Sequence, residues 1–96
     1  MNRTELFREA VTQWGVDAQV ALAIEEMAEL TKELCKLKRQ DYSYTAQSIQ
    51  PLIKELADVL IMLDQIAYTF DINTDIVYED NLKHLAKLLE GTGDRQ

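Results

Sequence analysis

Carboxylates recur at helical spacing in two separate stretches of this 96-residue chain. The first stretch reads Glu-Glu-Met-Ala-Glu over residues 25–29, and the second reads Glu-Leu-Ala-Asp over residues 55–58. Residues three apart share one face of a helix, so each stretch can direct two acids toward one place. Gathered carboxylates resist ionisation together, and hard cations that prefer oxygen ligands relieve the repulsion. The pattern therefore indicates a Mg²⁺ site, with Mn²⁺ as a substitute.

A helical wheel shows how close each of these acids lies to the apolar face of its helix. Glu26 and Glu29 border the apolar arc of their helix, whereas Glu25 lies further round toward solvent. Glu55 and Asp58 occur in the most apolar stretch of the chain, where an unpaired charge is expensive to bury. If the two helices pack antiparallel, Glu26, Glu29, Glu55 and Asp58 can meet.

Two other interpretations compete. Glutamate-rich helices are commonly solvated faces, and the nearby Lys32 and Lys36 suit that interpretation. A di-iron carboxylate bundle also places acids inside helices, but it uses Glu-x-x-His from two helices. The one histidine, His84, stands far from both motifs, so all-oxygen ligation favours Mg²⁺ or Mn²⁺ over iron.

Helical periodicity predicts the elements that must position the acids. We expect an all-α fold of four helices and no strand, forming one domain over residues 1–96. The predicted helices cover 4–14 with Thr4 as cap, 18–40 with Asp17 as cap, 47–70 (or a start at Pro51 after a short turn), and a last helix from Asn73 or Thr74 to near Gly91. Residues 91–96 are expected to form a frayed tail. The third helix is apolar nearly all round, which predicts a dimer or tetramer.

Composition narrows the class of protein. Seventeen acidic and ten basic residues give a net charge of −7, which argues against a general nucleic-acid binder. The single cysteine, Cys35, allows no intramolecular disulfide and fits a reducing compartment. The first residues lack the apolar core of a signal peptide, and no apolar run is long enough to span a bilayer. We therefore expect a soluble cytoplasmic protein that does not bind membranes.

The two motifs together resemble the MazG-like all-α nucleoside triphosphate pyrophosphohydrolases. The resemblance rests on Glu-Glu-x-x-Glu at 25–29, twenty-five intervening residues and Glu-x-x-Asp at 55–58, and it covers roughly residues 10–90. It implies a four-helix bundle that hydrolyses (deoxy)nucleoside triphosphates to a monophosphate and pyrophosphate with Mg²⁺. It also implies that Glu26, Glu29, Glu55 and Asp58 are metal ligands, and that Glu25 and Glu29 serve catalysis. Relatives acting on dUTP or phosphoribosyl-ATP remain alternatives, as does a non-catalytic oligomer with a metal-stabilised acidic cluster.

Substrate contacts are predicted from the same resemblance. The last helix offers Asn81, Lys83 and Lys87 toward the phosphates, but it carries no arginine, which departs from the family pattern. Trp14 can stack on a nucleobase, or it can pack between the first two helices. The preferred base and sugar do not follow from these residues.

Overall fold

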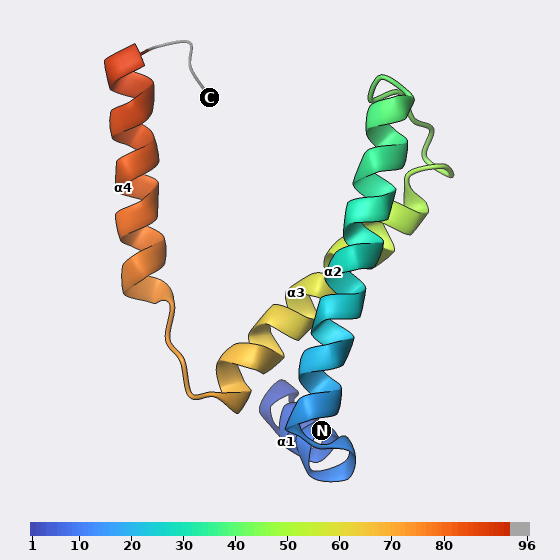
Figure 1. The fold of residues 1–96 in the computed structure, drawn as a ribbon, viewed down its shortest axis with the longest axis vertical. Helices are drawn as coiled ribbons and strands as arrows, with labels where there is room; N and C mark the ends of the chain where they lie inside the picture. Colours follow the sequence, from blue (N-terminus) through green and yellow to red (C-terminus); the bar gives the residue numbers. More distant parts are fainter. Residues whose placement is uncertain (93–96) are drawn as a thin grey trace.

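The fold is all-helical, as predicted. A computed structural model describes residues 1–92 and contains no strand within that range. The helices are α1 (Arg3–Trp14), α2 (Val16–Arg39), α3 (Gln50–Thr69) and α4 (Asp75–Thr92). Figure 1 shows α2 and α3 running in opposite directions and crossing, with α1 near the start of α2 and α4 standing apart. None of the helices over residues 1–92 is long and apolar enough to cross a membrane.

The first two helices are joined by a single residue. Gly15 has a φ of 90°, a conformation that glycine adopts without strain, and its N–H donates to the Val11 carbonyl at 2.8 Å. This tight junction lets α2 begin at Val16, so the prediction of Asp17 as its cap is wrong and Asp17 lies in the first turn. The cap predicted for α1 is also wrong, because the Asn2 side chain accepts from the Glu5 N–H at 2.8 Å and Thr4 is already helical.

The third helix begins later than residue 47. Thr45 and Ser48 exchange hydrogen bonds, with the Thr45 N–H donating to the Ser48 hydroxyl at 2.8 Å and the Ser48 N–H to the Thr45 hydroxyl at 3.0 Å. These bonds hold a short turn, after which α3 starts at Gln50 with Pro51 in its first turn. Proline suits that position because its missing N–H has no helical partner there. Of the two predicted starts, the later one is the better.

The core lies where α1, α2 and α3 meet. Its apolar members are Phe7, Ala23, Leu52, Val59 and Met62. Beside them the buried Gln65 side chain donates a hydrogen bond to the buried Gln19 side chain, which joins α3 to α2. Such a bond satisfies two amides that would be costly to bury unpaired. Phe7 also packs against Tyr68 with ring centroids 6.1 Å apart.

Two helices end in the same way, with an aspartate in the left-handed conformation. Asp41 follows α2 with a φ of 54°, and Asp71 follows α3 with a φ of 52°. At each end the next residue's N–H reaches back five residues, from Tyr42 to Leu37 and from Ile72 to Ala67, both at 2.9 Å. This is the Schellman arrangement, which satisfies carbonyls that the helix itself leaves open.

The last helix begins where the sequence predicts. The Asn73 side chain accepts from the Asp75 N–H at 2.9 Å, and the Thr74 carbonyl accepts from the Tyr78 N–H at 2.8 Å. Gly91 and Thr92 belong to α4 rather than to the predicted tail, and the remainder of that tail, 93–96, lies outside the described residues. Within residues 1–92, α4 makes no contact with α1, α2 or α3. Only three of the four predicted helices therefore pack together in one chain.

Candidate metal centre

Three carboxylates converge where α2 and α3 cross. Glu26 comes from α2, and Glu55 and Asp58 come from successive turns of α3. Each residue offers one oxygen, and these three oxygens lie within 4.8 Å of one another. All three side chains are half-buried. The antiparallel crossing thus gathers three of the four acids that the sequence places on the packed faces.

Two oxygens of this cluster lack a partner. Glu26 Oε2 and Glu55 Oε2 are buried and have no hydrogen-bond partner among the described residues. A buried carboxylate oxygen without a donor carries the full cost of leaving water. A proton or a cation held between the two side chains would remove that cost.

The pKa of Glu26 is raised above its ordinary value of 4.5. The largest cause is the hydrogen bond that a protonated Glu26 can share with Glu55. Loss of hydration and repulsion from Glu55 and then Asp58 act in the same direction, and only Lys54 opposes them. Without metal, the cluster therefore makes Glu26 easier to protonate than a glutamate in water.

Among the described residues, Lys54 is the cation that lies against the cluster. Lys54 Nζ lies 2.7 Å from Asp58 Oδ2 and 3.6 Å from Glu55 Oε1. The hydrogen bond to Asp58, then the negative charges of Asp58 and Glu55, raises the pKa of Lys54. Three ionised carboxylates and one ammonium leave a net charge of −2, which a divalent cation balances. Sequence reasoning missed Lys54, although its position four residues before Asp58 is the usual spacing of a helical ion pair.

A small cavity borders the carboxylates. It measures about 190 Å³ and is lined by Glu26 and Asp58 together with Leu22, Ile61 and Met62. The apolar walls limit how much water can surround a charge placed here, which strengthens its attraction to the acids.

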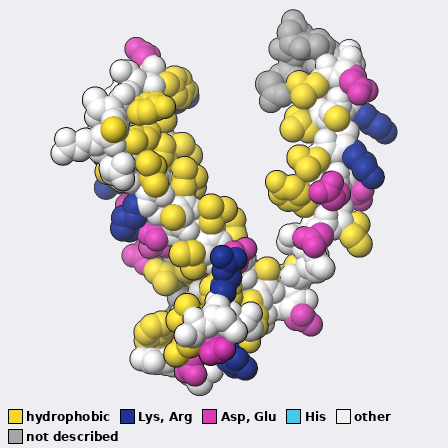
Figure 2. Space-filling model, turned by 180° about the vertical axis from the view of Figure 1, so that it is seen from behind, with side chains coloured by type: hydrophobic (Ala, Val, Ile, Leu, Met, Phe, Trp, Pro, Cys, Tyr) yellow, Lys and Arg dark blue, Asp and Glu magenta, His cyan; other side chains and the backbone are white. Residues whose placement is uncertain are grey.

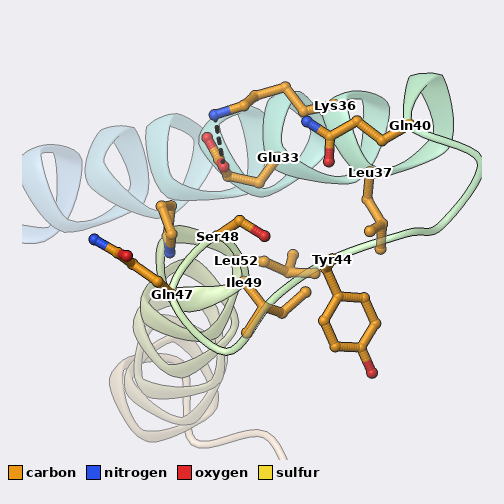
Figure 3. A pocket seen from close by; sticks show the side chains of 10 residues that line it. Glu33, Lys36, Leu37, Gln40, Tyr44, Gln47, Ser48, Ile49 and Leu52 are labelled. Atoms are coloured by element: carbon orange, nitrogen blue, oxygen red, sulfur yellow. Dashed lines mark ion pairs between the residues drawn. The ribbon is translucent and has the colours of Figure 1, made fainter.

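A second, more polar cavity lies further along the same two helices. It measures about 290 Å³, and Figure 3 shows its lining residues on α2, on the connection between α2 and α3, and at the start of α3. Leu37, Ile49 and Leu52 supply apolar surface, while Lys36 Nζ lies 3.3 Å from Glu33 Oε1 in the wall. Leu52 precedes Glu55 by three residues, so this cavity lies about one helical turn from the carboxylates.

The other predicted catalytic residues are not part of the cluster. Glu29 follows Glu26 by one turn of α2, but its side chain is exposed and it does not belong to the group of converging oxygens. Glu25 is exposed as well, as its place on the helical wheel predicts. The structure therefore brings together Glu26, Glu55 and Asp58, and leaves Glu25 and Glu29 at the rim.

The predicted substrate-binding residues are not part of the cluster. Trp14 is 61% exposed, so it is not packed in the core, and it lines a surface cavity of about 330 Å³ with Phe7 and Ile61. Asn81, Lys83 and Lys87 are exposed on α4, which does not contact the helices that carry the carboxylates within residues 1–92. Within residues 1–92 of one chain, none of these three residues lies on a helix that contacts the acidic cluster.

Comparison with known proteins adds no relative. No protein-family model, no curated protein and no solved structure matches this chain. The acidic cluster and the two sequence motifs are therefore the features that point to a function.

Proposed function

We propose that this chain is a Mg²⁺-dependent nucleoside triphosphate pyrophosphohydrolase that functions as a dimer or tetramer. The observation that carries the proposal is the pair of buried oxygens on Glu26 and Glu55 that have no partner among the described residues, set in a cluster whose net charge is −2 when its three carboxylates are ionised. Two partnerless oxygens beside a third carboxylate match the few-carboxylate, water-rich coordination that Mg²⁺ prefers, and Mn²⁺ can replace it. Such a site leaves positions for substrate phosphates.

Each residue of the cluster has a distinct part. Glu26, Glu55 and Asp58 would hold the ion, and Lys54 would fix the orientation of Asp58 through its 2.7 Å contact. When bound, Mg²⁺ neutralises the polyphosphate and lowers the pKa of the water that attacks the α phosphate. Glu29, one turn beyond Glu26, would complete the ligand set or accept a proton from that water, and Glu25 would support it in an outer role.

The reaction class comes from the resemblance to MazG-like pyrophosphohydrolases. Attack of water at the α phosphate breaks the bond to the β phosphate and releases a monophosphate and pyrophosphate. The cavity that Glu26 and Asp58 line also has apolar walls. This combination suits a substrate with a charged reacting group and an uncharged remainder. Asn81, Lys83, Lys87 and Trp14 stay the proposed substrate contacts, with the first three requiring a position of α4 that one chain does not provide.

The proposal is tested by measuring pyrophosphate release with Mg²⁺ from a panel of ribo- and deoxyribonucleoside triphosphates that includes dUTP, together with phosphoribosyl-ATP. We expect release from at least one substrate, and a loss of roughly 100-fold or more in kcat/KM for Glu55→Gln. The matched control is Asp80→Asn, which removes one exposed carboxylate from α4 and should keep full activity.

A parallel melting experiment separates catalysis from metal binding. An ion that binds only the folded chain raises its melting temperature by mass action, so millimolar Mg²⁺ or Mn²⁺ should stabilise the wild type more than Glu55→Gln. Stabilisation without any pyrophosphate would support the non-catalytic metal site instead. Absence of both effects would exclude a metal at these acids.

A further inference from the structure

This chain exposes far more surface than a compact protein of its mass. Its accessible surface is 7793 Å², whereas a folded monomer of 11.0 kDa exposes about 5,600 Å². Its radius of gyration is 17.0 Å, against roughly 12.5 Å for a compact domain of this length. The excess of about 2,200 Å² is surface that a compact fold would bury.

Much of the exposed apolar surface is ordered on α3. Ile53, Leu56, Leu60 and Leu63 are each between 44% and 62% exposed, and the row ends at Ala67. Their spacing of three and four residues in alternation is that of a helix seam that packs along a second helix. We call these five residues the α3 seam.

A matching row runs along α4. Tyr78, Leu82, Leu85 and Leu89 are spaced four, three and four residues apart, and each is at least 42% exposed. We call these four residues the α4 seam. At about 100° per residue, Ile76, Lys83 and Lys87 fall on the opposite side of the helix. The helix therefore has one face built for contact and one for solvent.

The two seams border the same open space. Figure 2 shows apolar side chains on the facing sides of the α2–α3 arm and of α4, with a gap between the two arms. At the base of this angle, Leu60 and Leu63 of the α3 seam and Tyr78 of the α4 seam line one cavity of about 520 Å³, together with Ile72. Hydrogen bonds define both ends of the connection, through Asp71 and Ile72 after α3 and Asn73 before α4.

We propose that a second copy of this chain fills this open angle, with the α4 seam of each copy packed on the α3 seam of the other. The two seams have the same residue spacing and similar lengths, and every copy of the chain carries both. A two-fold axis can therefore pair the α4 seam of each copy with the α3 seam of the other, which is an isologous contact. The excess surface of about 2,200 Å² per chain, or about 4,400 Å² for two chains, lies within the 2,000–5,000 Å² in total that obligate dimers bury. This inference is independent of the proposed catalytic function.

The contact has a consequence for α4. Packing by the α4 seam leaves Lys83 and Lys87 on the outer face, directed away from the partner, so this contact would remove both lysines from the proposed substrate contacts. Asn81 lies next to the seam on the helical wheel, and it is the one polar residue of the three that the partner would approach.

Oligomeric mass tests the first half of the proposal. Sedimentation of the full chain at micromolar concentration should give at least twice 11.0 kDa. Leu85→Glu, in the middle of the α4 seam, should shift the mass toward 11.0 kDa. Ile76→Glu makes the same chemical change on the opposite face of α4, where the side chain is 78% exposed, and should leave the mass unchanged. A monomeric wild type, or equal effects of the two variants, overturns the proposal.

Cross-linking tests which surfaces meet. In a Cys35→Ser background, a tagged Leu60→Cys chain is mixed with an untagged Leu85→Cys chain and treated with a short bis-maleimide. The expected product joins tagged to untagged chains. Cross-linking within one chain that carries both cysteines, with none between chains, would show that α4 folds back on its own α3. Joining only Leu85→Cys chains to each other would show that α4 pairs with α4. Either of these results overturns the reciprocal contact.

Discussion

The crossing of α2 and α3 differs from α4 although all three helices are amphipathic. At the crossing, Val59 is 7% exposed and Met62 is 5% exposed, and the buried glutamine pair joins the two helices. On α4 every described side chain is exposed, including Leu82 and Leu85 of its seam. The difference teaches that helical periodicity predicts which face will be buried, but not which surface buries it.

The same two regions differ in their electrostatics. The crossing holds three carboxylates at half-buried positions, and among the described residues one lysine, Lys54, lies against them. Charges on α4 are dispersed over an exposed face, where water screens them and each pair is worth little. The crossing is thus the place where a bound cation would change stability most.

The largest expected effect is a loss of stability at the crossing. Its absence would contradict the difference in packing between the crossing and α4. Met62→Ala opens a cavity at the crossing and should lower the free energy of unfolding by about 2–5 kcal/mol. Ile76→Ala, on the outer face of α4, should change it by no more than about 0.5 kcal/mol. Both are measured by chemical denaturation at one protein concentration. Equal losses would mean that the outer face of α4 is packed as tightly as the core.

A second expected effect is the pH dependence of the metal-free protein. Because the folded chain raises the pKa of Glu26 above 4.5, it binds that proton more tightly than the unfolded chain does. Between pH 4.5 and the raised value the folded state therefore holds more protons, and stability falls as the pH rises through this window. Melting temperatures measured against pH in the presence of a chelator report this slope.

Matched variants assign that slope to the cluster. Glu26→Gln should flatten the dependence, whereas Glu25→Gln, which removes an exposed carboxylate next to it, should keep the wild-type profile. Saturating Mg²⁺ should reverse the slope, since the metal binds the ionised carboxylates. If Glu26→Gln kept the wild-type dependence of melting temperature on pH, Glu26 would not be the group that causes the slope.

The smallest expected effect concerns the junction that separates the two regions. Asp71 has a φ of 52° at the end of α3, a conformation that glycine adopts freely and alanine does not. Asp71→Gly should change stability by a few tenths of a kcal/mol, because relief at the helix end offsets the greater freedom of the unfolded chain. Asp71→Ala should be less stable than Asp71→Gly by about 1 kcal/mol, measured by urea denaturation. Equal stability of the two variants would show that the left-handed turn is not retained.

Much of the fold follows from the sequence. The four helices and the start of α4 after Asn73 and Thr74 come from periodicity and from local side-chain chemistry, which depend on neighbours a few residues away. The errors lie at helix starts, where two local solutions compete. Asn2 caps α1 in place of Thr4, and Gly15 makes so tight a junction that Asp17 is already inside α2. At residues 45–48, a hydrogen-bonded turn replaces the first turn of the longer helix that periodicity also allows.

The candidate site also depends partly on local spacing and partly on tertiary packing. Spacing alone places Glu26, Glu55 and Asp58 on packed faces, because the helical repeat fixes which residues share a face. Only the crossing of α2 and α3 decides that these three oxygens meet within 4.8 Å while Glu29 stays at the rim. The position of α4, and with it that of Asn81, Lys83 and Lys87, also depends on contacts beyond the local chain. Local hydrogen bonds and periodicity act within a few residues, whereas the meeting of separate helices is set by packing over the whole molecule.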